Sequence, residues 1–111
     1  MFMNSIKEID APELHIWVKE KHPNMRVIDV RGMGEIASGT VSGAEAVPLH
    51  TLPVKLNEFK REEKLVFICH SGARSAQACM FLQQQGYDNV YNLRGGMLGW
   101  RRSGLEASAL A

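Results

Sequence analysis

The residues best suited to chemistry in this chain lie in the stretch FICHSGARSAQA, which runs from Phe67 to Ala78. Cys69 ends an apolar run there, and Gly72 and Arg74 follow it closely. A thiol becomes a good nucleophile only as the thiolate, and an unperturbed cysteine of pKa about 8.5 is only about 3% ionised at pH 7. Lowering that pKa by roughly 2 units, which corresponds to ~2.7 kcal/mol, makes the thiolate the major form. The place of Cys69 in the fold therefore decides what it can do.

Two elements position this cysteine. The segment KLVFIC, residues 64–69, predicts the most buried strand of the chain, because Leu65–Ile68 are consecutively apolar. The segment RSAQACMFLQQQG, residues 74–86, predicts a helix that stops at Gly86. A strand should therefore end at Cys69, and a helix should begin shortly after it.

The rest of the chain alternates in the same way. Further strands are predicted over residues 6–9, 25–31, 46–49 and 89–93. Further helices are predicted after an N-cap at Asp10, around residues 52–59, and between the glycines of residues 95–104. This alternation indicates one α/β domain over residues 1–111, with a central, mainly parallel sheet.

The predicted junction can activate a thiol. Ligands of open α/β sheets bind at the carboxyl ends of the strands, where Cys69 lies. Gly72 can adopt a positive φ, and the following helix directs its unpaired N–H groups and positive dipole end toward the same point. Arg74 adds a permanent positive charge. A cysteine at a strand end can also be a small core residue, but Gly72, Arg74 and Ser75 at close range favour a nucleophile.

The other thiol and the histidines give weaker signals. Cys79 lies within the predicted helix among apolar neighbours, where core packing is favoured over a role as resolving thiol. His70 could act as a base, although a solvent-facing or loop-bracing role is favoured for a neighbour of the nucleophile. His15, His22 and His50 are interpreted as surface or packing residues. Two cysteines make no disulfide framework, and dispersed histidines without a C-x-x-C motif predict no metal site.

Composition excludes several classes of function. The chain has 13 Lys and Arg against 12 Asp and Glu, a net charge of +1, and the basic residues are scattered, which argues against nucleic acid as a partner. No apolar run approaches the ~20 residues of a membrane helix. The stretch MFMNSIKEIDAPEL lacks the features of a secretory signal. We therefore expect a cytoplasmic protein with reduced thiols.

Three motifs occur along the chain in the order DVRGMGEIASGTVSGAEAVP, CHSGARS and NLRGGMLGW. Together they resemble the rhodanese family, the single-domain kind of sulfurtransferase, over nearly the whole chain. The first is similar to the family's stretch from Asp-Val-Arg to Gly-Ala and Pro, the second to its active-site loop, and the third to its closing Leu-x-Gly-Gly-x-x-x-Trp element. The positions in register are Asp29, Val30, Arg31, Glu35, Gly39, Gly43, Ala44, Pro48, Leu93, Gly95, Gly96 and Trp100. Thr40 replaces a common His of the family, and Ser42 a common Pro. The resemblance implies a rhodanese-like fold with helices on both faces of the sheet.

The resemblance also implies a reaction. Cys69 would take the outer sulfur of thiosulfate or a similar small donor, expel sulfite, and hold a persulfide until cyanide, a small thiol or a thiol protein removes the sulfur. No metal or organic cofactor is implied. The implied binding loop comprises His70, Ser71, Gly72, Ala73, Arg74 and Ser75, in which Arg74 attracts the dianionic donor. Asp29 and Arg31 would brace this loop, although an ordinary ion pair at a strand end explains them nearly as well.

Two other functions are compatible with a reactive cysteine. Phosphatases and arsenate reductases on a related fold use Cys-x5-Arg, whereas this chain has Cys-x4-Arg, with Ser75 where their arginine would stand. A loop one residue shorter suits a single sulfur atom better than a phosphate. A non-catalytic module would be expected to lack the cysteine, whereas a redox sensor would keep it, because an accessible thiolate also oxidises readily.

Overall fold

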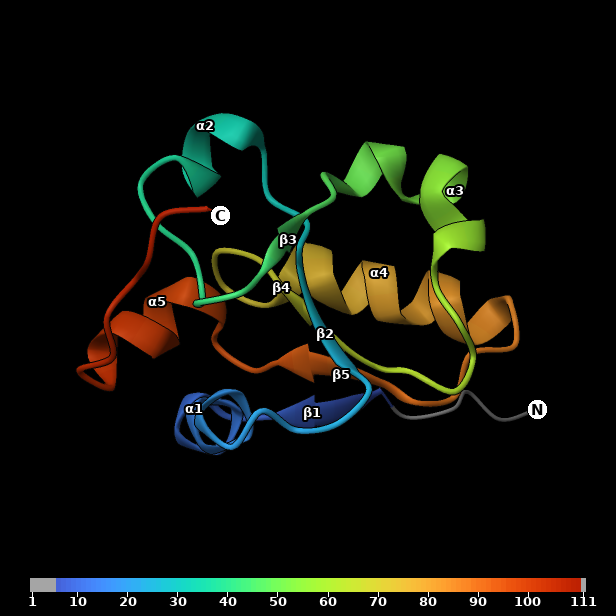
Figure 1. Ribbon diagram of the computed structural model, residues 1–111. Coiled ribbons are helices and arrows are strands. Elements are labelled where there is room, and N and C mark those ends of the chain that lie inside the picture. The colour runs from blue at the N-terminus through green and yellow to red at the C-terminus, as the bar shows by residue number, and fades with distance from the viewer. Residues whose placement is uncertain (1–5, 111) are drawn as a thin grey trace.

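The computed structural model describes residues 6–110, in which helices and strands alternate along the chain (Figure 1). The strands are β1 (Lys7–Ile9), β2 (Met25–Asp29), β3 (Glu45–Ala46), β4 (Lys64–Ile68) and β5 (Val90–Leu93). The α-helices are α1 (Ala11–Lys19), α2 (Met33–Ile36), α3 (Leu52–Lys55), α4 (Ala73–Gln84) and α5 (Gly96–Arg102). Two 3-10 turns, η1 (Leu49–Thr51) and η2 (Leu56–Glu58), flank α3. None of the helices within residues 6–110 has the length and apolar composition needed to cross a bilayer.

The five described strands form one sheet in the order β1-β5-β4-β2-β3, and every pairing is parallel. The prediction of a mainly parallel sheet is therefore confirmed. The strand β4 lies at the centre, where Ile68 pairs with Asp29 of β2 and Phe67 pairs with Asn92 of β5. Because parallel strands end at the same edge of a sheet, Cys69 emerges between the carboxyl ends of β2 and β5.

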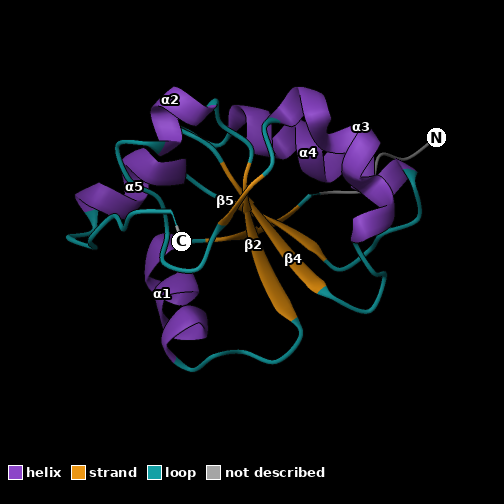
Figure 2. Ribbon diagram, turned by 45° about the horizontal axis from the view of Figure 1, so that its top comes forward, coloured by secondary structure: helices purple, strands orange, loops and turns teal. Residues whose placement is uncertain are grey.

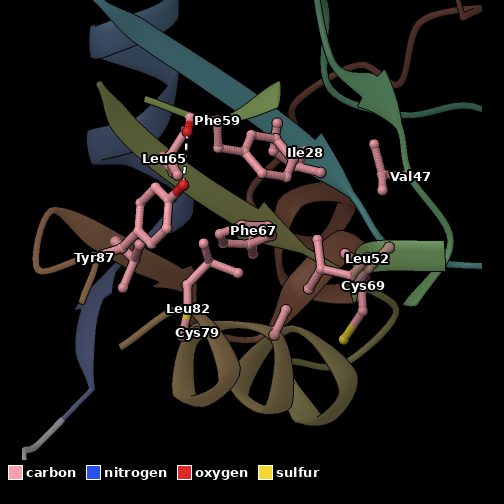
Figure 3. Close-up of a cluster of buried hydrophobic side chains, with 13 residues drawn as sticks. Ile28, Val47, Leu52, Phe59, Leu65, Phe67, Cys69, Cys79, Leu82 and Tyr87 are labelled. Atoms are coloured by element: carbon pink, nitrogen blue, oxygen red, sulfur yellow. Dashed lines mark hydrogen bonds between the residues drawn. The ribbon is translucent and has the colours of Figure 1, made fainter. Parts of the chain in front are cut away.

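Helices cover both faces of the sheet, as predicted, with α1 and α5 on one face and α3 and α4 on the other (Figures 1 and 2). Alternate side chains of β4 supply the two cores, since successive residues of a strand point to opposite faces. Val66 and Ile68 pack in the core under α1 and α5. Leu65 and Phe67 pack in the core under α3 and α4 (Figure 3). Burial of each such side chain contributes roughly 1.5–3 kcal/mol, so β4 is firmly held up to Cys69.

The chain after β2 differs from the prediction. The predicted strand over residues 46–49 was wrong in extent: β3 ends at Ala46, because Pro48 has a fixed φ and no N–H, and η1 begins directly after it. The predicted helix over residues 52–59 is divided into α3 and the 3-10 turn η2. The short helix α2 was not predicted, because only four residues form it and one of them is Gly34.

The first turn of α5 lies directly against the start of the loop after β4. The N–H groups of Met97 and Leu98 donate to the carbonyl oxygens of Cys69 and His70, at 2.8 and 3.0 Å. Gly96 has φ +57°, and a Cβ atom on it would lie 2.5 Å from both carbonyl oxygens. Glycine at position 96 is therefore what lets α5 approach the loop.

We predict that Gly96→Ala lowers the free energy of unfolding and displaces the loop that holds Cys69. Backbone strain alone should account for about 1–3 kcal/mol of this loss. Chemical denaturation measures the first effect, and the rate of Cys69 alkylation measures the second. Gly34→Ala is the matched control, because a Cβ atom there meets nothing within 4 Å. Gly34 lies in the helix α2, so it should tolerate alanine with no loss of stability. Equal losses in the two variants would contradict the importance of the close approach.

Candidate active site

The structure places Cys69 directly after β4, and α4 begins at Ala73, so the predicted strand-to-helix junction is confirmed. Gly72 is the N-cap of α4 and has φ +108°, a left-handed conformation that reverses the chain at this point. A Cβ atom on Gly72 would lie 3.5 Å from the backbone nitrogen of Gly95 and 3.6 Å from the carbonyl oxygen of Leu93. The loop therefore rests on the segment that joins β5 to α5.

The sulfur of Cys69 is surrounded by hydrogen-bond donors. The N–H of Gly72 donates to Sγ at 3.0 Å, and the Ser75 hydroxyl lies 3.3 Å from it. Burial raises the pKa of Cys69, but hydrogen bonds from the Ser75 hydroxyl and from the N–H groups of Ser75, Gly72 and Ser71 together outweigh it and lower the pKa below that of an ordinary thiol. The site can therefore stabilise a thiolate.

A buried polar group on β5 contacts both the loop and Ser75. Asn92 is 3% exposed, and its side-chain amide nitrogen lies 3.2 Å from the carbonyl oxygen of Gly72. Its carbonyl oxygen accepts a hydrogen bond from the hydroxyl of Ser75, which is fully buried. The amide nitrogen also lies 3.3 Å from a carboxylate oxygen of Glu8 on β1. Asn92 thus joins two neighbouring strands to the loop.

Arg74, the cation of the loop, forms an ion pair with Glu35 of α2. Its two terminal nitrogens lie 2.7 and 2.8 Å from the two carboxylate oxygens. The hydrogen bonds from Arg74 lower the pKa of Glu35 to about 2, helped by the N–H of Gly32, so this carboxylate is ionised throughout the neutral range. Both side chains remain partly exposed, and the pair joins α2 to the first turn of α4.

Asp29 and Arg31 are both buried and form an ion pair with each other. The Arg31 Nη2 atom lies 2.8 Å from Asp29 and also donates to the carbonyl oxygen of Gly39. The hydroxyl of Thr40 donates to Asp29 at 2.7 Å. The pair therefore anchors the segment of residues 39–40, and it reaches the loop indirectly, because Asp29 pairs with Ile68 beside Cys69.

Comparison with known proteins agrees with this geometry. The rhodanese-like domain family matches residues 11–103 of the chain. The chain belongs to this family. It is 40% identical over 104 residues to a sulfurtransferase of Allochromatium vinosum, covering 94% of this chain and 96% of that one. It is 36% identical to a putative sulfurtransferase of Bacillus subtilis, covering 86% and 90% of the two chains.

Solved rhodanese structures share the fold. A rhodanese-related protein of Thermoplasma volcanium superposes with a TM-score of 0.83 at 30% identity, covering 94% of this chain and 99% of that one. A rhodanese-like domain protein of Staphylococcus aureus superposes with a TM-score of 0.81 at 35% identity, covering 94% and 100%. The architecture described above is therefore the rhodanese-like fold.

The second thiol of this rhodanese domain is placed very differently from the first. Cys79 is buried within α4 beside Leu82, apart from Cys69 at the end of β4 (Figure 3). Burial, with a smaller effect of the Glu8 charge, raises the pKa of Cys79 to about 12. Cys79 is therefore a protonated core residue at neutral pH, in agreement with the sequence interpretation.

The remaining loop residues form the exposed rim of the site. His70, Ser71 and Ala73 are exposed, whereas Ser75 is buried beneath them. The backbone carbonyl of His70 is held by α5, while its side chain faces solvent. Among residues 6–110, no three His, Cys, Asp or Glu side chains lie close enough together to hold a metal ion.

Sequence reasoning missed two functional contacts of the rhodanese loop. Asn92 was included only as part of a strand, and Glu35 only as a residue in register with the family. A polar side chain between Val90 and Leu93, in a strand expected to be buried, is the signal that could have drawn attention to Asn92. The partner of Glu35 lies 39 residues further along the chain, and the sequence alone contains no signal for that pairing.

We predict that Thr40→Val lowers the free energy of unfolding by about 1.5–3 kcal/mol, because a buried, charged oxygen of Asp29 loses one of its hydrogen-bond donors while the side-chain shape is kept. Thr51→Val is the matched control, since its hydroxyl donates to the neutral carbonyl of Pro48 at a partly buried position. Its loss should be about 0.5–1.5 kcal/mol. Urea denaturation of both variants measures the difference, and an equal loss would show that Thr40 is not a special support of Asp29.

Proposed function

We propose that this rhodanese domain is a sulfurtransferase that carries sulfur as a persulfide on Cys69. The observation that supports it most is the Gly72 N–H, 3.0 Å from a sulfur whose pKa is lowered by its surroundings. In the first step the Cys69 thiolate attacks the outer sulfur of thiosulfate or a similar donor. A bond forms between Sγ and that sulfur, the S–S bond of the donor breaks, and sulfite leaves with the electron pair.

In the second step an acceptor, either cyanide or a thiolate, attacks the outer sulfur of the persulfide. The bond between the two sulfurs breaks, and Cys69 leaves as the thiolate. The backbone N–H groups of the loop are available to the sulfur in both anionic states, which is the form of electrostatic stabilisation that such loops provide. Every step exchanges one bond to sulfur for another, so the reaction needs no metal or organic cofactor, and ping-pong kinetics are expected.

A sulfur donor or acceptor would approach Cys69 from the exposed rim of the loop. The rim residues His70, Ser71 and Ala73 are exposed, whereas the sulfur lies below them. We assign the loop of residues 70–75 to donor and persulfide binding. We assign Asp29 and Arg31 to its support, through the pairing of β2 with β4.

We predict that Cys69→Ser abolishes persulfide formation and sulfur transfer while the fold remains intact, because the only sulfur supported by the loop is removed. Mass spectrometry after incubation with thiosulfate should show the gain of one sulfur atom in the unmodified protein and no gain in the variant. Cys79→Ala is the matched control, and it should keep transfer activity despite some loss of stability from the cavity.

Two results would contradict the proposal. Sulfur transfer that survives in Cys69→Ser would place the chemistry elsewhere. A protein that gains only oxygen on Cys69 under peroxide, and never sulfur from a donor, would be a redox sensor instead.

The pairing of Arg74 with Glu35 gives a second prediction. Glu35→Gln should lower the KM for thiosulfate by up to about fivefold with little change in kcat, because an exposed ion pair contributes up to ~1 kcal/mol and Arg74 would become free for the dianion. Glutamine keeps an oxygen for the N–H of Gly32, so α2 should remain capped. Steady-state kinetics with varied thiosulfate measure this change.

The matched control for Glu35→Gln is Glu58→Gln, which removes another exposed, paired carboxylate in the turn η2. It should leave the KM unchanged. A rise in KM for Glu35→Gln would show that Glu35 positions Arg74 for the donor rather than competing with it.

A further inference from the structure

The contacts of Asn92 fix the orientation of its side-chain amide. The two oxygens near its amide nitrogen belong to the Gly72 carbonyl and the Glu8 carboxylate, at 3.2 and 3.3 Å. A backbone carbonyl and a carboxylate can only accept hydrogen bonds, so the NH₂ group of Asn92 must face them. Its carbonyl oxygen must therefore face the hydroxyl of Ser75, which has a proton to donate.

The Ser75 hydroxyl carries one proton and has two neighbours that can accept it. One is the carbonyl oxygen of Asn92, and the other is the sulfur of Cys69 at 3.3 Å. When Cys69 is a thiol, its S–H can donate to Ser75 while Ser75 donates to Asn92, and all three groups are satisfied. When Cys69 is a thiolate, the hydroxyl proton must turn toward the sulfur, and the buried carbonyl oxygen of Asn92 loses its donor.

We propose that Asn92 is a positioning residue for the nucleophile, because its carbonyl oxygen competes with the Cys69 sulfur for the single proton of the Ser75 hydroxyl. A buried acceptor left without a donor is unfavourable. Ionisation of Cys69 is therefore opposed by the loss of the hydrogen bond to the Asn92 carbonyl oxygen. Asn92 thereby limits how acidic Cys69 becomes. This limit matters because the intrinsic nucleophilicity of a thiolate falls as its pKa falls, and the best attacking thiol has a pKa near the ambient pH.

If Cys69 transfers sulfur as proposed, the Ser75 hydroxyl changes its acceptor during the reaction cycle. This part of the inference rests on the proposed function. In the persulfide the negative charge lies on the outer sulfur, so Sγ is uncharged and the Ser75 hydroxyl returns to Asn92. When an acceptor attacks the outer sulfur, Cys69 departs as a thiolate and the hydroxyl turns back to it, which stabilises the leaving group. No proton leaves Ser75 at any stage, because only the direction of its O–H bond changes.

The other ionisable groups around the site stay the same in the test below. They are His70 and Arg74 in the loop, Glu35 on α2, Asp29 and Arg31 beside β4, Glu8 on β1, and Cys79 in α4. Only Glu8 changes its surroundings, because Asn92→Leu removes its contact with the Asn92 amide. That change is the same with and without Ser75, so the double-mutant cycle separates it from the coupling between Ser75 and Asn92.

The test is a double-mutant cycle on the pKa of Cys69, measured by the ultraviolet absorbance of its thiolate during a pH titration. The four proteins are the unmodified chain, Asn92→Leu, Ser75→Ala and the double variant. Asn92→Leu should lower the pKa by about one unit, because the hydroxyl is then free for the thiolate. Ser75→Ala should raise the pKa. Adding Asn92→Leu to Ser75→Ala should change nothing further, because Asn92 acts through Ser75.

A merely structural role of Asn92 gives the opposite sign. If Asn92 only held the Gly72 carbonyl, its loss would displace the Gly72 N–H from the sulfur, and the pKa would rise both with and without Ser75. That result would overturn the proposal. The titration uses no sulfur donor, so its outcome is independent of whether Cys69 transfers sulfur.

A second measurement needs no substitution at Asn92, in case Asn92→Leu fails to fold. In the unmodified protein, the ¹³C resonance of the Asn92 side-chain carbonyl should titrate with the same midpoint as the Cys69 absorbance, because its donor leaves when the thiolate forms. The movement should shrink in Ser75→Ala. A carbonyl resonance that stays still while the Gly72 amide resonance moves would contradict the competition.

Discussion

The site depends on the hydrogen bonds that fix two carbonyl groups at the start of the loop. The carbonyl oxygens of Cys69 and His70 accept hydrogen bonds from Met97 and Leu98 of α5, at 2.8 and 3.0 Å. In a planar trans peptide the N–H points away from the C=O, so anchoring the His70 carbonyl to α5 turns the N–H of Ser71 the other way. That N–H is one of the groups that lower the pKa of Cys69. The helix α5 therefore orients the N–H of Ser71 toward the sulfur, whereas the other donors to the sulfur belong to Gly72 and Ser75.

The charges near the loop are arranged so that they largely cancel. Arg74 is paired with Glu35, and Arg31 is paired with Asp29. Paired charges produce weak fields at a distance, whereas hydrogen bonds to the sulfur act directly. The stability of the thiolate therefore comes from oriented N–H and O–H dipoles rather than from an excess of positive charge.

The sequence was sufficient to predict those features of the structure that depend on a local pattern. The apolar run of Leu65–Ile68 predicts a central strand because burial on both faces demands it, and Gly72 predicts the turn because few other residues adopt its φ of +108°. The sequence was insufficient where the signal is tertiary. Asn92 meets Ser75 across 17 residues, and Glu35 meets Arg74 across 39, so both contacts depend on strand order rather than on any nearby pattern. The early end of β3 was missed because the apolar residues Val47 and Leu49 favoured a strand that continued past Pro48.

The two cysteines show that burial alone does not decide the pKa of a thiol. Cys69 and Cys79 are 1% and 0% exposed, yet the pKa of the first is lowered and that of the second is raised to about 12. Within α4 the N–H groups around Cys79 are already used by the hydrogen bonds of the helix, and none is left for a thiolate. The first N–H groups of a helix have no such partners, and those near Gly72 face Cys69 instead. The pKa of a thiol ten residues earlier in the chain is therefore lowered, because that thiol meets the helix at its unsatisfied end.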